Sequence, residues 1–166
     1  WSYREVLPYF KRAEDHQCGE SLYRGVGGPL HVLRSRVEHP LTRAFIQAGV
    51  EAGFPYNEDI NGARREGFGP AESTVWRGRR WSTAAAYLKP AMGRDNLTVM
   101  TDAQVTRIVL ENGRATGIEL RRGKERVVCS AGEVVLSAGA FQSPHLLMLS
   151  GIGRGEDLSA HGIATQ

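Results

Sequence analysis

Cysteine is scarce in this sequence, with only two among 166 residues. Cys18 and Cys129 are too few for a disulfide framework and lie too far apart for a C-x-x-C pair, so we expect a reducing, cytoplasmic compartment. His16 and Cys18 form an H-x-C pair, but no second pair completes the four ligands of a zinc site. The sequence therefore predicts no metal.

Long apolar runs are missing as well. Uninterrupted apolar stretches, such as the one from Leu146 to Leu149, are far too short to span a bilayer. No basic segment followed by an apolar one stands at the start, so no secretory signal is visible. The first residue is Trp1 rather than methionine. We therefore expect an internal fragment of a longer protein.

Clustered basic charge is also lacking, although the net charge is +3 and the pI is about 9.1. A nucleic-acid interface needs a basic stripe that neutralises several phosphates at once. The basic side chains are spread along this chain, and only Arg77, Arg79 and Arg80 cluster, beside Trp76 and Trp81. Arginine can also stack on indole rings. No nucleic-acid partner is predicted.

The chain as a whole has the composition of a soluble globular protein. The pattern of its first part predicts helices joined by long loops. Ser2 and Glu5 form an S-x-x-E capping box, which predicts the start of a helix that Pro8 kinks or divides. The remaining elements expected up to residue 95 are a glycine-rich surface loop at 19–28, a strand at 30–33, a helix at 40–52 with Gly53 just past its end, a loop-rich segment at 57–80 and a helix at 82–92 that Pro90 ends or bends.

From Asn96 the pattern becomes that of a sheet. A short strand is expected at 97–101. Asn112-Gly113 between two alternating segments, 105–110 and 115–121, is the strongest short-range signal of a β-hairpin. A further turn at Arg122-Gly123 leads to a third strand at 127–130. The sequence therefore predicts a three-stranded antiparallel meander.

The segment from Glu133 to Ala140 differs in kind, because three aliphatic residues follow one another without polar alternation. This pattern is typical of a strand covered on both faces in a parallel sheet. Ser143 and Pro144 are expected to start a helix that ends at Gly151. A strand, a turn of small residues and a helix form the unit in which α/β proteins hold cofactor phosphates. Since no G-x-G-x-x-G, G-x-S-x-G or H-E-x-x-H motif accompanies it, the pattern alone predicts a piece of an α/β nucleotide-type domain and names no reaction.

The stretch GAFQSPHLLMLSGIG at 139–153 resembles the second signature of the glucose-methanol-choline (GMC) oxidoreductase family. Other segments resemble the same family in the same order, with an overall similarity closest to its choline dehydrogenase branch. These segments are WSYREVLPYFKRAED at 1–15, GGPLHV at 27–32, NGARREGFGP at 61–70, GRRWSTAAAYLKPAM at 78–92 and NLTVMTDAQVTRI at 96–108.

The resemblance implies a mixed α/β fold and FAD as the cofactor. Residues 1–95 would belong to the substrate domain and the flavin cover. Residues 96–166 would form the middle portion of a discontinuous, Rossmann-like FAD-binding domain that includes the meander. In relatives, the position of Val105 contacts the adenine part of FAD through its backbone. Ser137, Ala138 and Gly139 correspond to the small-residue strand end beside the cofactor.

The resemblance also implies which parts are missing. The glycine fingerprint for the FAD pyrophosphate would lie upstream of Trp1, and the catalytic histidine would lie in a C-terminal segment. The missing N- and C-terminal segments of the same enzyme are therefore expected partners. No histidine of this chain occupies a matching motif, so we assign no catalytic residue. The five are His16, His31, His39, His145 and His161.

In this family a hydride passes from the alcohol carbon to flavin N5, and the flavin carries the chemistry. The expected substrate is choline or another small primary alcohol. Polyethers, aliphatic or aryl alcohols and sugars remain alternatives, as does a non-catalytic binding module. Trp76, Trp81 and Tyr87 are candidates for a cage around a quaternary ammonium group, although aromatic residues serve more often in packing. Oxygen and a respiratory carrier are both open as electron acceptor.

Overall fold

The structure is a computed structural model that describes all residues, 1–166. It divides into two compact units, Trp1–Leu97 and Thr98–Gln166. The division lies two residues from the expected boundary at 95/96, while the assignment of the two parts to a substrate domain and an FAD-binding domain stays a prediction. None of the helices combines the length and apolar character of a membrane span.

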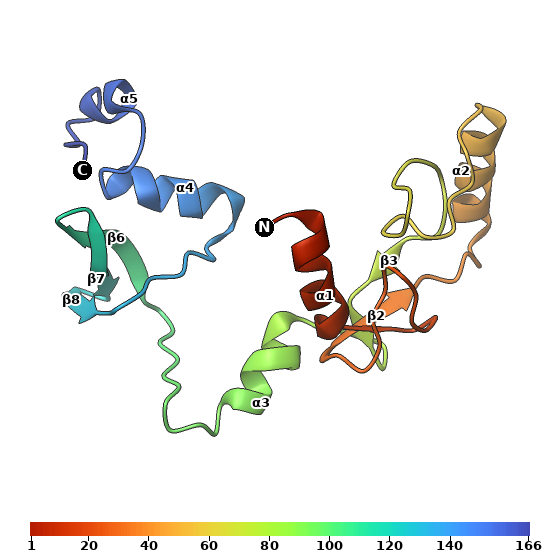
Figure 1. Ribbon diagram of the computed structural model, residues 1–166, viewed down its shortest axis with the longest axis horizontal. Helices are drawn as coiled ribbons and strands as arrows, with labels where there is room; N and C mark the ends of the chain where they lie inside the picture. The colour runs from red at the N-terminus through yellow and green to blue at the C-terminus, as the bar shows by residue number, and fades with distance from the viewer. The chain divides into compact units, whose positions relative to one another are not determined.

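The first unit combines helical segments with short strands (Figure 1). Strand β2 pairs in parallel with β1 and antiparallel with β3, and β4 and β5 form a separate antiparallel pair. The elements are α1 (Tyr3–Ala13), β1 (Glu14–His16), β2 (Leu30–Arg34), α2 (Pro40–Glu51), β3 (Glu72–Ser73), β4 (Val75–Trp76), β5 (Arg79–Arg80), the π-helical turn η1 (Ala84–Leu88) and α3 (Lys89–Ala91).

Local signals located these helices correctly. The Glu5 carboxylate accepts a hydrogen bond from the Ser2 backbone N–H at 2.8 Å, as a capping box requires. Pro8 lies inside α1, which is one continuous element rather than two pieces. Pro40 is the first residue of α2, where its missing N–H has no helical partner to lose. Pro90 lies in the first turn of α3, directly after η1, and so continues the helical segment rather than ending it.

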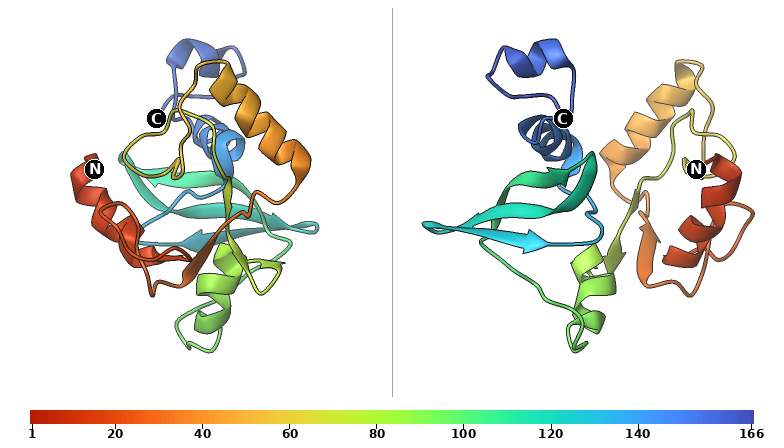
Figure 2. Two further views of the ribbon diagram at one scale, coloured as in Figure 1. Left: turned by 90° about the vertical axis from the view of Figure 1, so that its right-hand side faces the viewer. Right: turned by 60° about the vertical axis from the view of Figure 1, so that its left-hand side comes forward.

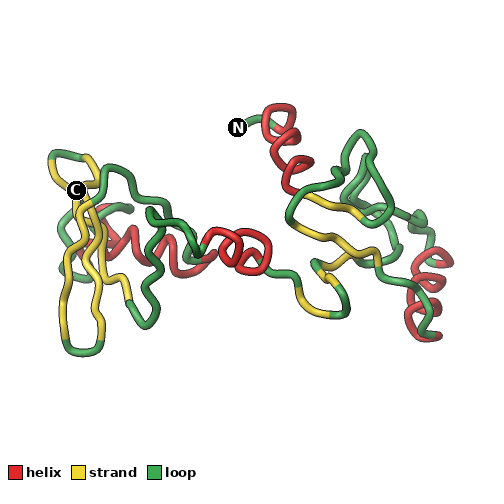
Figure 3. The backbone as a smooth tube through the Cα atoms, turned by 90° about the horizontal axis from the view of Figure 1, so that it is seen from below, coloured by secondary structure: helices red, strands yellow, loops and turns green.

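The second unit is the predicted meander with two helices. Its elements are β6 (Gln104–Glu111), β7 (Arg114–Arg122), β8 (Glu125–Ser130), α4 (Gly139–Leu149) and α5 (Gly155–Ser159). All neighbouring strands are antiparallel, in the order β6-β7-β8 (Figure 2), and tight turns join them (Figure 3). Asn112 and Gly113 have φ values of 52° and 76°, which are those of a type I′ turn. The hairpin prediction is confirmed.

The core of the second unit lies between the meander and the C-terminal helices. Helix α4 packs against β6. Ile108 and Leu120, on adjacent strands, are buried, as are Leu146 of α4 and Leu158 of α5. Leu158 is completely inaccessible to solvent. Burial of apolar side chains such as Leu146 of α4 and Ile108 of β6 stabilises the packing of α4 on the sheet.

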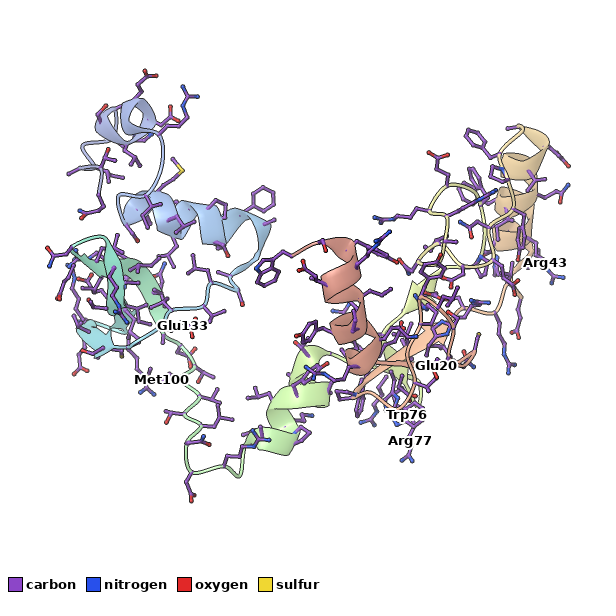
Figure 4. The ribbon with its side chains drawn as sticks, viewed as in Figure 1. Glu20, Arg43, Trp76, Arg77, Met100 and Glu133 are labelled. Atoms are coloured by element: carbon purple, nitrogen blue, oxygen red, sulfur yellow. The ribbon has the colours of Figure 1, made fainter.

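Two sequence-based strand predictions were wrong. Residues 97–101 form no strand, and Leu97, Val99 and Met100 are exposed. Glu133–Ala138 is irregular rather than a parallel strand, and α4 already begins at Gly139. Met100 and Glu133 lie on these irregular segments, before and after the meander (Figure 4). A doubly covered strand needs hydrogen-bonded neighbours, and β6, β7 and β8 pair only with one another.

The glycine-rich segment at 19–28 was expected to be a surface loop, and most of its residues are not buried. It has no regular secondary structure, but Arg24 and Gly25 within it are buried. Arg24 is held inside by carboxylates from other segments. Long-range pairing of this kind leaves no local signal in the sequence.

We predict that Gly113→Ala lowers the free energy of unfolding by about 1 kcal/mol, because alanine is strained at positive φ. A Cβ at Gly113 would meet no atom within 4 Å, so backbone strain is the expected cause. Gly132→Ala is the matched control, since Gly132 is equally open and its φ is not positive. Urea unfolding followed by circular dichroism measures both. Equal stability of the two variants would contradict the type I′ turn.

Candidate functional site

The four residues predicted to contact FAD all lie in the second unit. Val105 is in β6 opposite Leu120, and the register then skips to Arg107 opposite Glu119, leaving Thr106 as the extra residue of a β-bulge. The Thr106 hydroxyl donates to the Glu119 carboxylate at 2.8 Å. Bulges interrupt regular pairing and are frequent beside binding sites. The backbone at Val105 is thus at an irregular point of the strand.

Ser137, Ala138 and Gly139 form the entry to α4. Because α4 begins at Gly139, Ser143 lies within the helix and is not its N-cap as expected. The Ser143 hydroxyl accepts a hydrogen bond from the Ala138 N–H at 3.1 Å. Gly139 has φ of 94° and open space where a Cβ would stand. Ala138 at the N-cap has no side-chain oxygen for the first N–H groups of α4. These groups therefore remain free for solvent or for an anionic ligand.

These features fit a dinucleotide cofactor in part. A free helix N-terminus suits a negatively charged group, and a glycine without neighbours lets a ligand approach the backbone. Val105 lies in β6 and Gly139 is the first residue of α4, and these two elements pack together. No glycine-rich phosphate loop follows a strand in this chain. The chain therefore supplies a part of such a site.

A second cluster, which the sequence did not reveal, is centred on Glu72 in β3. The Glu72 side chain is only 4% exposed. Its Oε1 accepts from His16 Nε2 at 2.8 Å, and its Oε2 accepts from Arg24 at 2.6 Å and from the Asn61 amide at 3.0 Å. The Arg34 guanidinium lies 3.7 Å away. We call Glu72 and these four partners the Glu72 cluster.

Further carboxylates surround Arg24. Glu14 is 3.1 Å and Asp59 is 3.9 Å from its guanidinium. The residues of the Glu72 cluster are far apart in the sequence, and Glu72 comes 56 positions after His16. The pairing of β1, β2 and β3 brings His16, Arg34 and Glu72 together, and Arg24 and Asn61 reach Glu72 from loops. Only the strand pairing, and no motif, could have indicated this.

The surroundings of Glu72 set its ionisation. Burial raises the pKa of its carboxyl, but hydrogen bonds from His16 and Asn61 and the charge of Arg24 outweigh burial, and the pKa lies below its usual 4.5. The folded state therefore favours the carboxylate. Its stabilising contribution is present above the unfolded pKa and is lost as the pH falls through the folded pKa.

A cavity of about 590 Å³ adjoins the Glu72 cluster. The apolar side chains Val6, Leu7 and Phe10 of α1 line one part of it, and Arg24 and Glu72 line another. The volume is in the range of small-molecule pockets. Nothing in its lining identifies a ligand.

Two of the three aromatic residues considered as an ammonium cage, Trp76 and Trp81, lie against the ring of a histidine. His31 stacks on Trp76 with 3.8 Å between ring centroids, and its ring centroid is 5.1 Å from that of Trp81. His31 Nδ1 lies 2.6 Å from the Asp15 carboxylate, and hydrogen bonds from the Gly27 N–H and from His31 lower the pKa of Asp15. Tyr87 lies apart from this stack in sequence, on η1. This arrangement indicates packing around His31 rather than an open cage.

Comparison with known proteins identifies the class. The sequence matches the GMC oxidoreductase family over residues 1–163, and the chain belongs to this family. It is 54% identical over 164 residues to the oxygen-dependent choline dehydrogenase of Rhizobium meliloti (strain 1021), covering 98% of this chain and 30% of that protein. It is 48% identical over 159 residues to the mitochondrial choline dehydrogenase of Mus musculus, covering 95% and 27%. The chain thus spans about a third or less of the length of these relatives.

Solved structures agree with the fold. The pyridoxine 4-oxidase of Mesorbium loti superposes with a TM-score of 0.87 at 39% identity, over 99% of this chain and 33% of the other. An FAD-dependent oxidoreductase from Chaetomium thermophilum gives a TM-score of 0.84 at 23% identity, over 99% and 31%. The predicted mixed α/β fold and the GMC resemblance are confirmed.

We predict that Glu72→Gln lowers the free energy of unfolding at about pH 7 by about 3 kcal/mol, because it leaves Arg24 buried among fewer negative charges. The difference from wild type should shrink as the pH falls below 4.5 and through the lowered pKa of Glu72 in the folded state, where wild type also loses its carboxylate. Urea unfolding followed by tryptophan fluorescence at a series of pH values measures both effects.

Glu58→Gln is the matched control. Glu58 also pairs with an arginine, Arg34 at 3.3 Å, but its side chain is 75% exposed. We expect a change within about 0.5 kcal/mol for this exposed pair. An equal decrease in the free energy of unfolding of the two variants would show that the buried Glu72 cluster stabilises the protein no more than an exposed ion pair does.

Proposed function

We propose that this chain is the middle portion of an FAD-dependent oxidoreductase that oxidises the CH–OH group of choline or a similar small primary alcohol. The observation that carries the proposal is 48–54% identity to choline dehydrogenases across nearly the whole chain. GMC oxidoreductases are flavoproteins, and the superposed structures include an FAD-dependent oxidoreductase. A proposed cytoplasmic location rests only on the two free cysteines.

In this proposal residues 96–166 hold part of the cofactor. The Val105 backbone would contact the adenine end, and Ser137, Ala138 and Gly139 would line the cofactor at the start of α4. The bulge at Thr106 and the uncapped N-terminus of α4 support these roles. When bound, FAD would supply the hydride acceptor for the alcohol carbon.

Residues 1–95 would form part of the substrate domain and flavin cover in the same proposal. None of the five histidines is assigned to catalysis. His16 is bound to Glu72, His31 to Asp15, and the His39 ring nitrogen accepts from the Leu41 N–H at the start of α2. The catalytic histidine and the pyrophosphate-binding glycines would come from other segments of the enzyme.

A second candidate is oxidation of an aryl alcohol. The similarity to pyridoxine 4-oxidase, at 39% identity and a TM-score of 0.87, favours it. The higher identity to choline dehydrogenases favours choline. Both candidates keep the same cofactor and differ in the substrate.

We predict that choline bleaches the oxidised flavin absorbance of the full-length enzyme under anaerobic conditions, because a hydride taken from the alcohol reduces the flavin. Stopped-flow absorbance with choline, pyridoxine and a panel of aliphatic and sugar alcohols measures this. Bleaching by pyridoxine alone would support the second candidate. Absence of bleaching with every alcohol would contradict the proposed reaction.

We also predict that the isolated 166-residue chain is inactive, poorly soluble and at least about 100-fold weaker than the full-length enzyme in FAD affinity. It lacks the glycine turn for the pyrophosphate, and the loss of two charge-assisted hydrogen bonds weakens affinity by about two to four orders of magnitude. Titration of FAD followed by fluorescence quenching measures the affinity. A soluble monomer that binds FAD at micromolar concentration would contradict this expectation.

A further inference from the structure

Ser150, directly after the last residue of α4, joins this helix to strand β6. Its hydroxyl donates to the Leu146 carbonyl at 2.6 Å and accepts from the Ile108 backbone N–H at 2.8 Å. Ser150 is 8% exposed and Ile108 is 6% exposed, so both hydrogen bonds are shielded from water. A buried backbone N–H without a partner is unfavourable, so the Ile108 N–H needs a hydrogen-bond acceptor at this position.

The turn after Ser150 fixes the direction of its hydroxyl. The Gly151 N–H donates to the Met148 carbonyl at 3.0 Å and the Ile152 N–H to the Leu147 carbonyl at 2.9 Å, which is a Schellman motif. Gly151 has φ of 86°, and a Cβ there would stand 2.6 Å from the Ala164 carbonyl oxygen. The end of α4 is therefore closed in one conformation, with the Ser150 side chain toward β6.

We propose that Ser150 is a positioning residue that sets the angle between α4 and β6 and thereby the spacing of the two FAD-contacting segments. This inference rests on the proposed function, in which Val105 of β6 and Gly139 of α4 face the cofactor. Gly139 and Ser150 are at opposite ends of α4, about 16 Å apart at the helical rise. A pivot of about 10° at Ser150 would move Gly139 by about 3 Å. Such a shift exceeds the distance range over which a hydrogen bond is retained.

Substitution in the full-length enzyme tests the proposal. We expect Ser150→Ala to raise the Kd of the apoprotein for FAD about tenfold or more and to change the visible circular dichroism of the bound flavin. Ser150→Thr keeps a hydroxyl, and Ser150→Val has nearly the same shape without one. We therefore expect Ser150→Thr to bind FAD more tightly than Ser150→Val. This pair separates the hydrogen bond from side-chain volume.

Leu158→Ala is the matched control for stability. Leu158 is fully buried in the same unit, so its truncation should lower the melting temperature at least as much as Ser150→Ala does. Its effect on the Kd for FAD should stay below about threefold, because the bond between α4 and β6 is untouched.

The outcomes separate the two levels of the proposal. If wild type binds FAD and Ser150→Ala binds it equally well, the positioning role is wrong and the proposed function stands. The same holds if affinity follows melting temperature alike in the Ser150 and Leu158 variants. If wild type itself binds no FAD, the proposed function fails and the positioning role fails with it.

Discussion

The pairing of polar groups that are shut off from water is the constraint on which both units depend. In the first unit, the buried carboxylate of Glu72 receives hydrogen bonds from His16, Arg24 and Asn61. In the second, the Ser150 hydroxyl satisfies the buried N–H of Ile108. The pairing is not complete, because His16 Nδ1, Arg24 Nε and Arg34 Nε are buried without a hydrogen-bond partner. Each unit has few buried apolar side chains, so losing one of the hydrogen bonds to Glu72 or Ser150 would offset much of what their burial contributes.

The two solutions differ in their physical character. The Glu72 cluster is built around charged groups, the Glu72 carboxylate and the guanidinium groups of Arg24 and Arg34, whose mutual attraction must outweigh the cost of removing them from water. Its value therefore depends on pH, through the lowered pKa of Glu72. The Ser150 bond is neutral and depends on geometry alone. The first unit should accordingly respond to acid at this cluster, whereas the junction of α4 and β6 should not.

The range of the interaction decided what could be predicted from the sequence. The capping box at Ser2 and Glu5 and the hairpin turn at Asn112-Gly113 are complete within a few residues, and both are present in the structure. The Glu72 cluster requires three strands from distant parts of the chain, and the Ser150 bond spans 42 positions. No local pattern could indicate either. The FAD-contacting positions came from family resemblance, and residues such as Val105 carry no chemical signal of their own.

The incorrect strand prediction at 133–140 shows that a local pattern can also suggest an element whose long-range partners are absent. The aliphatic run at 134–136 was interpreted from its composition, but a strand exists only where neighbouring backbones accept and donate its hydrogen bonds. In this chain the segment is irregular, and Val135 is 79% exposed.

Helix α4 also exposes apolar surface. Apolar residues lie on all of its sides, and Phe141 is 89% exposed. A helix that is apolar on every face is typical of a buried position, and a contiguous exposed apolar surface marks an interaction site. The relatives are about three times as long as this chain, and one superposed oxidase contains the same fold within 33% of its own length. The exposed apolar side chains of α4 are thus best explained as surface that other segments of the proposed enzyme cover. On that interpretation the bond at Ser150 has a second consequence. It fixes one face of α4 on β6 and so determines which faces remain for those segments.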